Sequence, residues 1–460
     1  MAPPAAEPRS EVLANPRLLL QEPLLTTATR VVVALSGGLD STVLLHLCAM
    51  LRSSGLAAPL SAFHVQHGLQ DEAEEWLVHC RRLCESLDVP LSSVHLHLGA
   101  QGARSEGEAR RARYEAFAAH LPEGAVLLQA HHQQDQVETV LFRFLRGSGV
   151  RGLSGMPRQR RCGKGWLLRP LLAVPRDELE RYARRHGLSW IEDPSNGESF
   201  YARNFLRHEV LPLLRSRWSQ VDRQVLESAE RSADAAVLLQ ELAEADLKSV
   251  QGPHATMLDV VALKAMSAVR RNNLLRHWCA RLVGEGAPLL SSTVLARVES
   301  ELLDAAIDAT PMLRWGEEGR ELSLRRFGKY VHLVRALPVM LSALDLRAGE
   351  TLELPAPLGR LLWQRSDRGG LALREGERLQ VRFRIGGERI KPVGRPTREL
   401  KKLLQELNVP PWLRDLVPLV YRGEELIAVA DFVIAEAAKA ESGQNALRLV
   451  WVRPDLHCGD

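Results

Sequence analysis

The stretch VVVALSGGLDST, residues Val31–Thr42, decides the fold of this chain. Its first five residues, Val31–Leu35, are apolar and mostly β-branched, which is typical of a strand buried on both faces of a parallel sheet. Ser36-Gly37-Gly38 follows as a turn, and Thr42–Leu51 is apolar at helical spacing. The stretch therefore predicts a strand, a glycine turn and a helix in direct succession.

The glycine turn has the chemistry of an anion site. Paired glycines permit positive φ and leave room for a ligand close to the backbone. Free N–H groups and the positive end of the helix dipole favour an anion there. Ser36 and Ser41 add hydroxyls, and Asp40 could hold Mg²⁺ against phosphate oxygens. The turn lacks the Gly-Lys-Ser/Thr of a Walker A loop and is not Gly-x-Gly-x-x-Gly, so a purely structural turn is the alternative.

The motif SGGLDS, residues 36–41, resembles the pyrophosphate loop (PP-loop) of the N-type ATP pyrophosphatases, which split ATP into AMP and pyrophosphate. The following segment HVQHGL resembles the second motif of that superfamily, which implies contact with the adenine side of ATP. The ATP-binding residues implied by this resemblance are Ser36, Gly37, Gly38, Leu39, Asp40, Ser41 and His67.

Three more apolar segments, Leu60–Gln66, Val94–Leu98 and Val126–Ala130, predict further strands. Helical spacing at Glu72–Leu87 and Glu106–Tyr114 places helices between them. This alternation predicts an α/β fold with a doubly wound parallel sheet, in which ligands bind beyond the carboxyl ends of the strands.

The fourth predicted strand runs directly into HHQQDQVET, residues His131–Thr139, at the start of a helix. Asp135 and Glu138 are three residues apart and share one helix face. Such a pair can position Mg²⁺ or hold the ammonium group of a lysine. The alternative is that both are helix-start acids favoured by the helix dipole.

Basic charge gathers next to this region. Arg110 and Arg113 lie on one face of a predicted helix, where an arginine fork would match a phosphate, or where both would simply be solvated. Residues 143–185 contain 12 Lys/Arg against 3 Asp/Glu, and four glycines at 147–155 predict a loop instead of a regular helix. Residues 158–164 are predicted as a further loop, and 167–196 as a strand, a helix and a return strand. Positive charge beside a nucleotide site favours contact with a nucleic-acid backbone.

Within the superfamily the chain resembles the long form of the tRNA(Ile)-lysidine synthetases. The likeness is carried by the pattern AR-x-x-RY at 109–114, HH-x-DD-x-x-ET at 131–139, LRGSG at 145–149, RNFLRHEVLPLL at 203–214 and KKLLQELNVPPWLRDLVPLVY at 401–421. Gln134 departs from the pattern, because it stands where the first aspartate of DD is expected. Loss of that carboxylate puts activity or metal affinity in question.

The resemblance implies an ATP- and Mg²⁺-dependent ligase. It would join free L-lysine to C2 of the wobble cytosine in the CAU anticodon of tRNA(Ile) through an adenylated intermediate, changing the codon read from AUG to AUA. The implied catalytic residues are Asp40, Asp135, Glu138 and Arg113, with Asp40 also the metal ligand. The implied lysine-binding residues are Asp135, Glu138, His132 and Arg207. The expected tRNA contacts are Arg110, Arg146, Arg151, Arg203, Arg395, Arg398, Lys401 and Lys402.

The 460 residues predict several domains. We expect the catalytic domain at 1–220, a mainly helical tRNA-binding domain at 221–340, a connector at 341–364 and a small α+β tRNA-binding domain at 365–460. In the last of these, 381–391 predicts a hairpin around Gly-Gly, and 397–407 a helix capped by Thr397. Helical spacing also predicts a helix from Val221 to about Val250, and 416–434 predicts a further hairpin. Trp278 falls on the apolar stripe of a later helix and is expected in the core, whereas Arg271 is expected on the outer face of that helix.

The bulk composition narrows the function classes. A formal charge of +4 argues nothing by itself, and no apolar run is long enough to span a membrane. The N-terminus lacks the apolar core of a signal peptide, and six cysteines without a CxxC pair are typical of a reduced cytoplasmic protein. A homodimer is a further expectation. The alternatives are a PP-loop tRNA thiolase, a glutamine-dependent amide ligase, and an inactive tRNA-binding relic.

Overall fold

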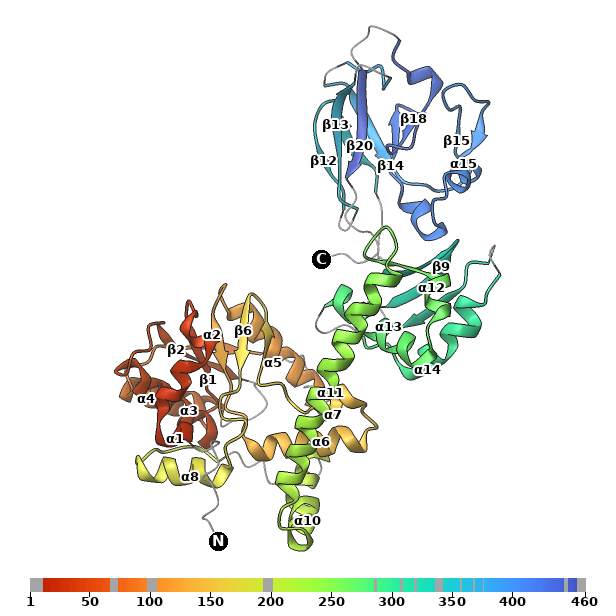
Figure 1. Cartoon of the computed structure of the whole chain (residues 1–460). Coiled ribbons are helices and arrows are strands. Elements are labelled where there is room, and N and C mark those ends of the chain that lie inside the picture. The colour runs from red at the N-terminus through yellow and green to blue at the C-terminus, as the bar shows by residue number, and fades with distance from the viewer. Residues whose placement is uncertain are drawn as a thin grey trace. The chain divides into compact units, whose positions relative to one another are not determined.

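The computed structural model describes residues 11–66, 73–96, 106–192, 202–284, 288–306, 309–317, 321–335, 342–355, 358–366, 369–374, 376–441 and 446–452. The chain divides into two compact units, 1–238 and 239–460, and each is described by itself (Figure 1). No helix in the described ranges is both long and apolar enough to cross a bilayer.

The first unit is built on a six-stranded sheet of order β3-β2-β1-β4-β6-β5. Its strands are β1 (Val31–Ala34), β2 (Leu60–Gln66), β3 (Leu91–His95), β4 (Val126–Leu128), β5 (Gln159–Cys162) and β6 (Gly165–Leu168). Neighbouring strands are parallel except for the edge strand β5, which runs antiparallel to β6. The doubly wound parallel sheet predicted from the sequence is confirmed, with one antiparallel edge added.

Helices cover both faces of this sheet. α3 (Leu39–Arg52), α4 (Ala73–Ser86) and α8 (Arg176–Arg185) pack against the alternate strand residues that include Val31 and Val33. α5 (Glu106–His120) packs against the opposite face, which includes Val32. The period of two in a strand thus places each neighbouring valine in a different core.

Eight further helices belong to the described part of the first unit. They are α1 (Glu11–Ala14), the 3-10 helix η1 (Pro16–Gln21), α2 (Pro23–Thr26), α6 (Gln133–Leu145), α7 (Val150–Leu153), α9 (Ala202–Phe205), the π-helix η3 (Leu206–Val210) and α10 (Leu211–Arg217). The glycines at 147–155 were predicted to exclude a helix. This prediction was wrong, because one helical turn, α7, forms between Gly149 and Ser154.

Three other local predictions in the first unit were wrong. β3 starts at Leu91, three residues before the predicted strand. Residues 158–164, predicted as a loop, form most of a β5–β6 hairpin, in which Cys162 is buried and the Arg161 guanidinium lies 4.2 Å from the centre of the Trp166 ring. The return strand predicted after α8 is absent from the described residues 186–192.

The second unit begins within α11 (Val221–Val250), which matches its predicted span, and continues with α12 (Val260–Ala265), α13 (Ala268–Val283), α14 (Ser292–Arg297) and the π-helix η4 (Val298–Leu303). These helices pack with an antiparallel sheet of order β7-β10-β9-β8. Its strands are β7 (Met257–Asp259), β8 (Met312–Trp315), β9 (Leu322–Phe327) and β10 (Tyr330–Arg335).

Trp278 on α13 is 1% exposed and its indole N–H donates to the Ala255 carbonyl at 2.8 Å, so its predicted place in the core is confirmed. Arg271 on the same helix was predicted to face solvent. It is instead 3% exposed, and it pairs with Glu299 at 2.7 Å.

The C-terminal part is rich in strands. β11 (Leu344–Arg347), β14 (Arg378–Arg382), β17 (Leu419–Arg422), β18 (Glu425–Val429) and β19 (Val433–Ile434) form one sheet, β12 (Leu352–Glu353), β13 (Arg360–Ser366) and β20 (Ala446–Val452) a second, and β15 (Arg389–Ile390) and β16 (Arg398–Glu399) a pair. The predicted β17–β18 hairpin is confirmed.

Several predictions here need correction. Residues 341–364 were expected to be a connector, but β11 and β13 contribute buried residues to the same core as β20, and the partly buried Leu352 of β12 packs against it. The predicted 381–391 hairpin does not form, since β14 pairs with β11 and β17 while β15 pairs with β16. α15 (Leu400–Glu406) begins after Glu399 and not at Thr397. The other domain limits stay predictions.

Candidate active site

The Ser36–Ser41 turn connects β1 to α3 at the carboxyl edge of the sheet. Gly37 has φ +88°, and a Cβ atom there would lie 3.1 Å from the Cys80 Sγ, so glycine is required by both backbone and space. The Ser41 hydroxyl accepts from the Ser36 N–H at 3.2 Å and lies 3.1 Å from the Ser36 hydroxyl. The turn is therefore held in shape before any ligand binds.

Asp40, in the first turn of α3, is the acidic residue nearest to this loop. Its Oδ2 lies 3.6 Å from the Nε2 of His132, and its Oδ1 is buried without a hydrogen-bond partner in the described structure. Burial raises the pKa of Asp40, and the nearby Asp135 carboxylate raises it further, against the opposing charges of His132 and two arginines. A buried carboxylate oxygen without a partner is a fitting ligand for a cation.

The acids of α6 face two arginines from α9 and η3. Arg207 binds Glu138 through two hydrogen bonds, Nε to Oε1 at 2.6 Å and the terminal nitrogen to Oε2 at 2.9 Å. Arg203 donates to Glu138 at 3.0 Å, and both arginines reach Asp135 Oδ1, at 3.3 and 3.2 Å. Asp135 and Glu138 do share one helix face as predicted, and two guanidiniums neutralise them.

The ionisation of this network follows from its pairing. Burial alone would raise the pKa of Asp135, but the charges of His132, His131 and Arg203 and the N–H of His132 outweigh it and lower that pKa. Burial opposes the charge on Arg207, yet its hydrogen bonds and charge pairing with Glu138 raise its pKa. Pairing thus favours the charged forms of both Asp135 and Arg207.

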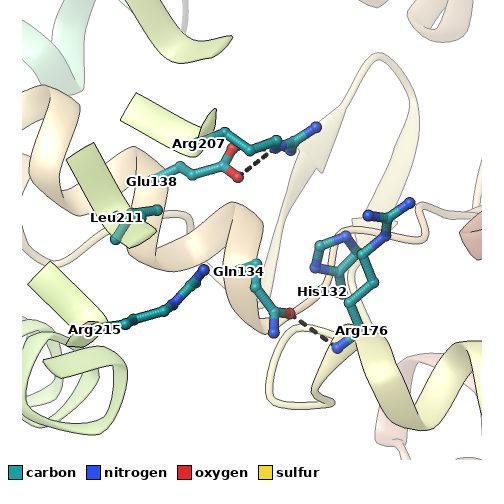
Figure 2. A pocket seen from close by; sticks show the side chains of 7 residues that line it. All are labelled: His132, Gln134, Glu138, Arg176, Arg207, Leu211 and Arg215. Carbon is teal, nitrogen blue, oxygen red and sulfur yellow. Dashed lines mark hydrogen bonds and ion pairs between the residues drawn. The ribbon is translucent and has the colours of Figure 1, made fainter. Parts of the chain in front are cut away.

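A cavity of about 210 Å³ opens beside Glu138 (Figure 2). Three of its lining residues are arginines, from α8, η3 and α10, and one is a carboxylate. The lining consists of His132, Gln134, Glu138, Arg176, Arg207, Leu211 and Arg215. The pocket can therefore pair with both ends of a zwitterion or with an anion.

Gln134, the departure from the motif, has a structural partner. Its Oε1 accepts from the backbone N–H of Arg176 at 2.9 Å, at the first residue of α8 (Figure 2). Pro175 occupies the N-cap position and has no side chain that can accept this bond. Aspartate is one methylene shorter, so glutamine at this position ties α6 to α8.

The remaining predicted residues are distributed as follows. Leu39 is buried at the start of α3, and Arg113, on α5, is exposed. Arg146 and Arg151 are exposed, and the guanidinium of Arg146 lies 5.1 Å from the centre of the Phe142 ring. Predicted His67 lies outside the described residues.

The C-terminal basic residues are largely paired. Arg395 lies 3.7 Å from Glu406, to which Arg398 also donates. Lys402 lies 3.5 Å from Glu399, whereas Lys401 is exposed with no ion pair in the part of the chain that the structure describes. Exposed ion pairs of this kind contribute little stability and exchange readily.

The sequence analysis missed Arg176 and Arg215 of the pocket. A signal existed for each. Arg176 follows a proline at the start of a helix behind the β6 strand, and Arg203, Arg207 and Arg215 recur at multiples of four residues. Such spacing places them along one side of a helical segment.

Three family models match the chain: a PP-loop domain over residues 10–214, the TilS substrate binding domain over 258–332, and the TilS substrate C-terminal domain over 379–451. The tRNA(Ile)-lysidine synthase of Coxiella burnetii is 39% identical over 422 residues, which span 91% of this chain and 92% of the relative. That of Pseudomonas aeruginosa is 42% identical over 442 residues, 92% and 93% of the two chains.

Among solved structures, the U34-tRNA thiolase NcsA from Methanococcus maripaludis with its [4Fe-4S] cluster is 18% identical. The match covers 48% of this chain and 78% of that chain, with a TM-score of 0.41.

Proposed function

This chain belongs to the tRNA(Ile)-lysidine synthase family, and from that premise we propose that it ligates free L-lysine to C2 of the wobble cytosine in tRNA(Ile) bearing a CAU anticodon, at the expense of ATP. The observation that carries the proposal is that His132 contacts both Asp40, in the Ser36–Ser41 turn, and Asp135 on α6. The chain also matches its relatives over about nine-tenths of its length.

ATP binds with its phosphates on the Ser36–Ser41 turn. Positive φ at Gly37, the two serine hydroxyls and the N-terminus of the 14-residue helix α3 support this placement. Leu39 contributes backbone N–H only, since its side chain is buried. His67 is proposed on the adenine side from the motif alone.

Asp40 would hold Mg²⁺. Magnesium in phosphate-transferring sites uses one or two carboxylates together with phosphate oxygens, so a single buried carboxylate oxygen without a hydrogen-bond partner is sufficient. When bound, the ion supplies positive charge against the phosphates. No group of three side chains able to ligate a metal occurs among the described residues, which fits an ion shared with the substrate.

Lysine occupies the pocket beside Glu138. Arg207, with Arg176 and Arg215, pairs with the lysine carboxylate, while Glu138 and Asp135 pair with its α-ammonium group. His132 lies 3.5 Å from Asp135 and 3.6 Å from Asp40, and so fixes the distance between the lysine side and the ATP side of the site. The ε-amine remains free and must be neutral, because an ammonium has no lone pair.

The reaction has two displacements. The 2-carbonyl oxygen of the cytosine attacks the α-phosphorus of ATP, and pyrophosphate leaves with the electron pair of the broken P–O bond. The lysine ε-amine then attacks C2, and AMP leaves with the oxygen. The nitrogen loses its protons to solvent or a nearby base. Arg113 and the site arginines stabilise the charge that develops, and catalysis is mainly positioning.

The tRNA lies along basic residues on both units: Arg110, Arg146, Arg151, Arg203, Arg395, Arg398, Lys401 and Lys402. Arg203 also pairs with Glu138 at 3.0 Å, so its role toward RNA is to orient the acids beside the bound base. The others are exposed or sit in exposed ion pairs, which a phosphodiester can displace.

Release of pyrophosphate from ATP tests the function, with tRNA(Ile) transcript, lysine and Mg²⁺ omitted in turn. We expect lysine-dependent turnover and a lysine-modified cytosine detectable by mass spectrometry of the digested tRNA. Dependence on sulfide would instead indicate the thiolase, dependence on glutamine the amide ligase, and no turnover at all the relic. A homodimer and a cytoplasmic location stay predictions, the first testable by light scattering.

A further inference from the structure

A second charged cluster lies on the α5 face of the sheet, around the Tyr114 hydroxyl. Tyr114 accepts from the terminal nitrogen of Arg169 at 3.3 Å and from that of Arg110 at 3.5 Å, and it donates to Gln129 at 3.1 Å. Gln129 and Arg169 directly follow β4 and β6, so the cluster sits at the carboxyl edge of the sheet. The guanidinium of Arg160 lies 4.5 Å from the centre of the Tyr114 ring.

Among the described residues, three arginines of this cluster have only neutral partners. Arg169 is 2% exposed, and its other donors reach His131 Nδ1 at 3.2 Å and the Pro157 carbonyl at 2.7 Å. Arg143, on α6, donates to the Gly152 and Gly155 carbonyls at 3.0 and 2.6 Å. Within the described ranges no carboxylate pairs with Arg110, Arg143 or Arg169.

Burial and mutual repulsion of these positive charges shift the pKa values of Arg169, Arg143 and Tyr114. Burial lowers the pKa of Arg169 and of Arg143, and in each case the charge of Arg110 lowers it further. Burial would raise the pKa of Tyr114, but the charges of Arg110 and Arg169 outweigh it. Removing a guanidinium from water without a counter-charge is unfavourable, as it is when one partner of a buried ion pair is removed.

The cluster adjoins the proposed active site without belonging to it. A guanidinium can only donate, so the bond from Arg169 leaves Nδ1 of His131 unprotonated and places the proton of the neutral ring on Nε2. The next residue, His132, contacts Asp40. The Ser36–Ser41 turn leads into α3, which packs on the opposite face of the sheet from α5.

We propose that Arg110, Arg143 and Arg169, with the Tyr114 hydroxyl, form a phosphate-binding site separate from the Ser36–Ser41 turn, and that it takes a phosphodiester of the RNA substrate. A phosphate oxygen supplies the missing negative charge and accepts the hydrogen bonds of an arginine fork. Arg110 is exposed and gives the site its opening, and exposed Arg146 and Arg151 lie farther along the same basic segment. The choice of RNA rests on the function proposed above.

The test uses Arg110→Gln, an exposed position that leaves the core intact, together with Arg169→Lys, which keeps the charge but loses the fork. The matched control is Arg111→Gln, because Arg111 is the next residue on α5, is exposed, and lies 3.9 Å from Glu115. Binding of tRNA(Ile) transcript is measured without ATP at several salt concentrations. The KM for ATP is measured at saturating tRNA and lysine.

We expect Arg110→Gln and Arg169→Lys each to weaken tRNA binding about tenfold, with Arg110→Gln reducing the salt slope by about 1, while the control changes neither. The KM for ATP should stay within twofold. A raised KM for ATP with unchanged tRNA binding would assign the site to a nucleotide phosphate and overturn the RNA assignment. No change in either quantity would overturn the site itself. Failure of lysine-dependent turnover in the unmodified protein would count against the proposed function only, because the tRNA-binding measurement does not depend on it.

Discussion

Helix α6 contributes to two charged clusters that differ in how their charge is balanced. Near its start, Asp135 and Glu138 are matched by Arg203 and Arg207. Near its end, Arg143 belongs with Arg110 and Arg169 to the cluster around Tyr114, and among the described residues these three arginines bond only to neutral groups. A balanced network is stable without substrate and fixes the positions of its members. An unbalanced cluster gains its counter-charge only when an anion arrives, so it links stability to binding.

The largest effect is expected when one negative charge is removed from the balanced cluster of Asp135, Glu138, Arg203 and Arg207. Glu138→Gln keeps the shape of the side chain but leaves two guanidiniums without their main counter-charge. We expect the free energy of unfolding to fall by about 3 kcal/mol and lysidine formation to fall at least tenfold. Urea denaturation and the pyrophosphate assay measure both. The control Glu180→Gln, a partly exposed partner of Arg184 on α8, should change neither.

The double variant Glu138→Gln/Arg207→Gln sharpens this result. Since it removes a cation together with the anion, it should recover part of the lost stability but none of the activity. Additive losses of stability would contradict a charge-balanced network.

Asp40→Asn separates activity from stability at the same site. We expect pyrophosphate release to fall about 100-fold, since the variant removes the proposed ligand of Mg²⁺. Because the pKa of Asp40 is raised above its ordinary 3.8 in the folded protein, its ionised form costs stability at neutral pH. The variant should therefore be at least as stable as the native protein at pH 7, with the difference closing as the pH falls toward 4. A clear loss of stability at pH 7 would contradict the inference that burial of the Asp40 carboxylate outweighs its contact with His132.

Gln134 tests the link between the balanced network and α8. Gln134→Asp shortens the side chain, so we expect loss of the bond to the Arg176 N–H and about 1 kcal/mol of stability, with activity within about threefold of native. Gln134→Glu keeps the reach and should retain the stability. A large gain in activity for the aspartate variant would mean that the native site lacks a carboxylate it needs.

The smallest effect is expected for exposed basic residues of the second unit. Lys401→Ala should weaken tRNA binding two- to threefold and lower the salt slope by about 1, because one exposed cation is removed. Arg398→Ala should do less, since its charge is already paired with Glu406. Equal effects would show that the ion pair does not compete with RNA.

Local predictions succeeded where one element alone decides the outcome. β2 and α11 have their predicted bounds, and Trp278 is buried as its helical stripe required. Predictions failed where partners from elsewhere decide. The sequence of β14 and β15 predicted one hairpin around Gly-Gly, but each of these strands pairs with a different partner. Residues 158–164 were predicted as a loop, but most of them form β5, which pairs with β6. Turn residues indicate that the chain changes direction, but they do not determine which strand will pair with the next segment.

The sequence by itself determined that a strand, a glycine turn and a helix follow one another at 31–52, and that Asp135 and Glu138 share a helix face, because local periodicity and the freedom of glycine are properties of neighbouring residues. Only the tertiary structure decided that Arg203 and Arg207, 65 and 69 residues after Glu138, neutralise those acids, and that Gln134 bonds to α8. It also decided that Arg110, Arg143 and Arg169 have no acidic partner among the described residues. Charge pairing depends on distances between separate elements, and the packing of the sheet and its helices sets those distances.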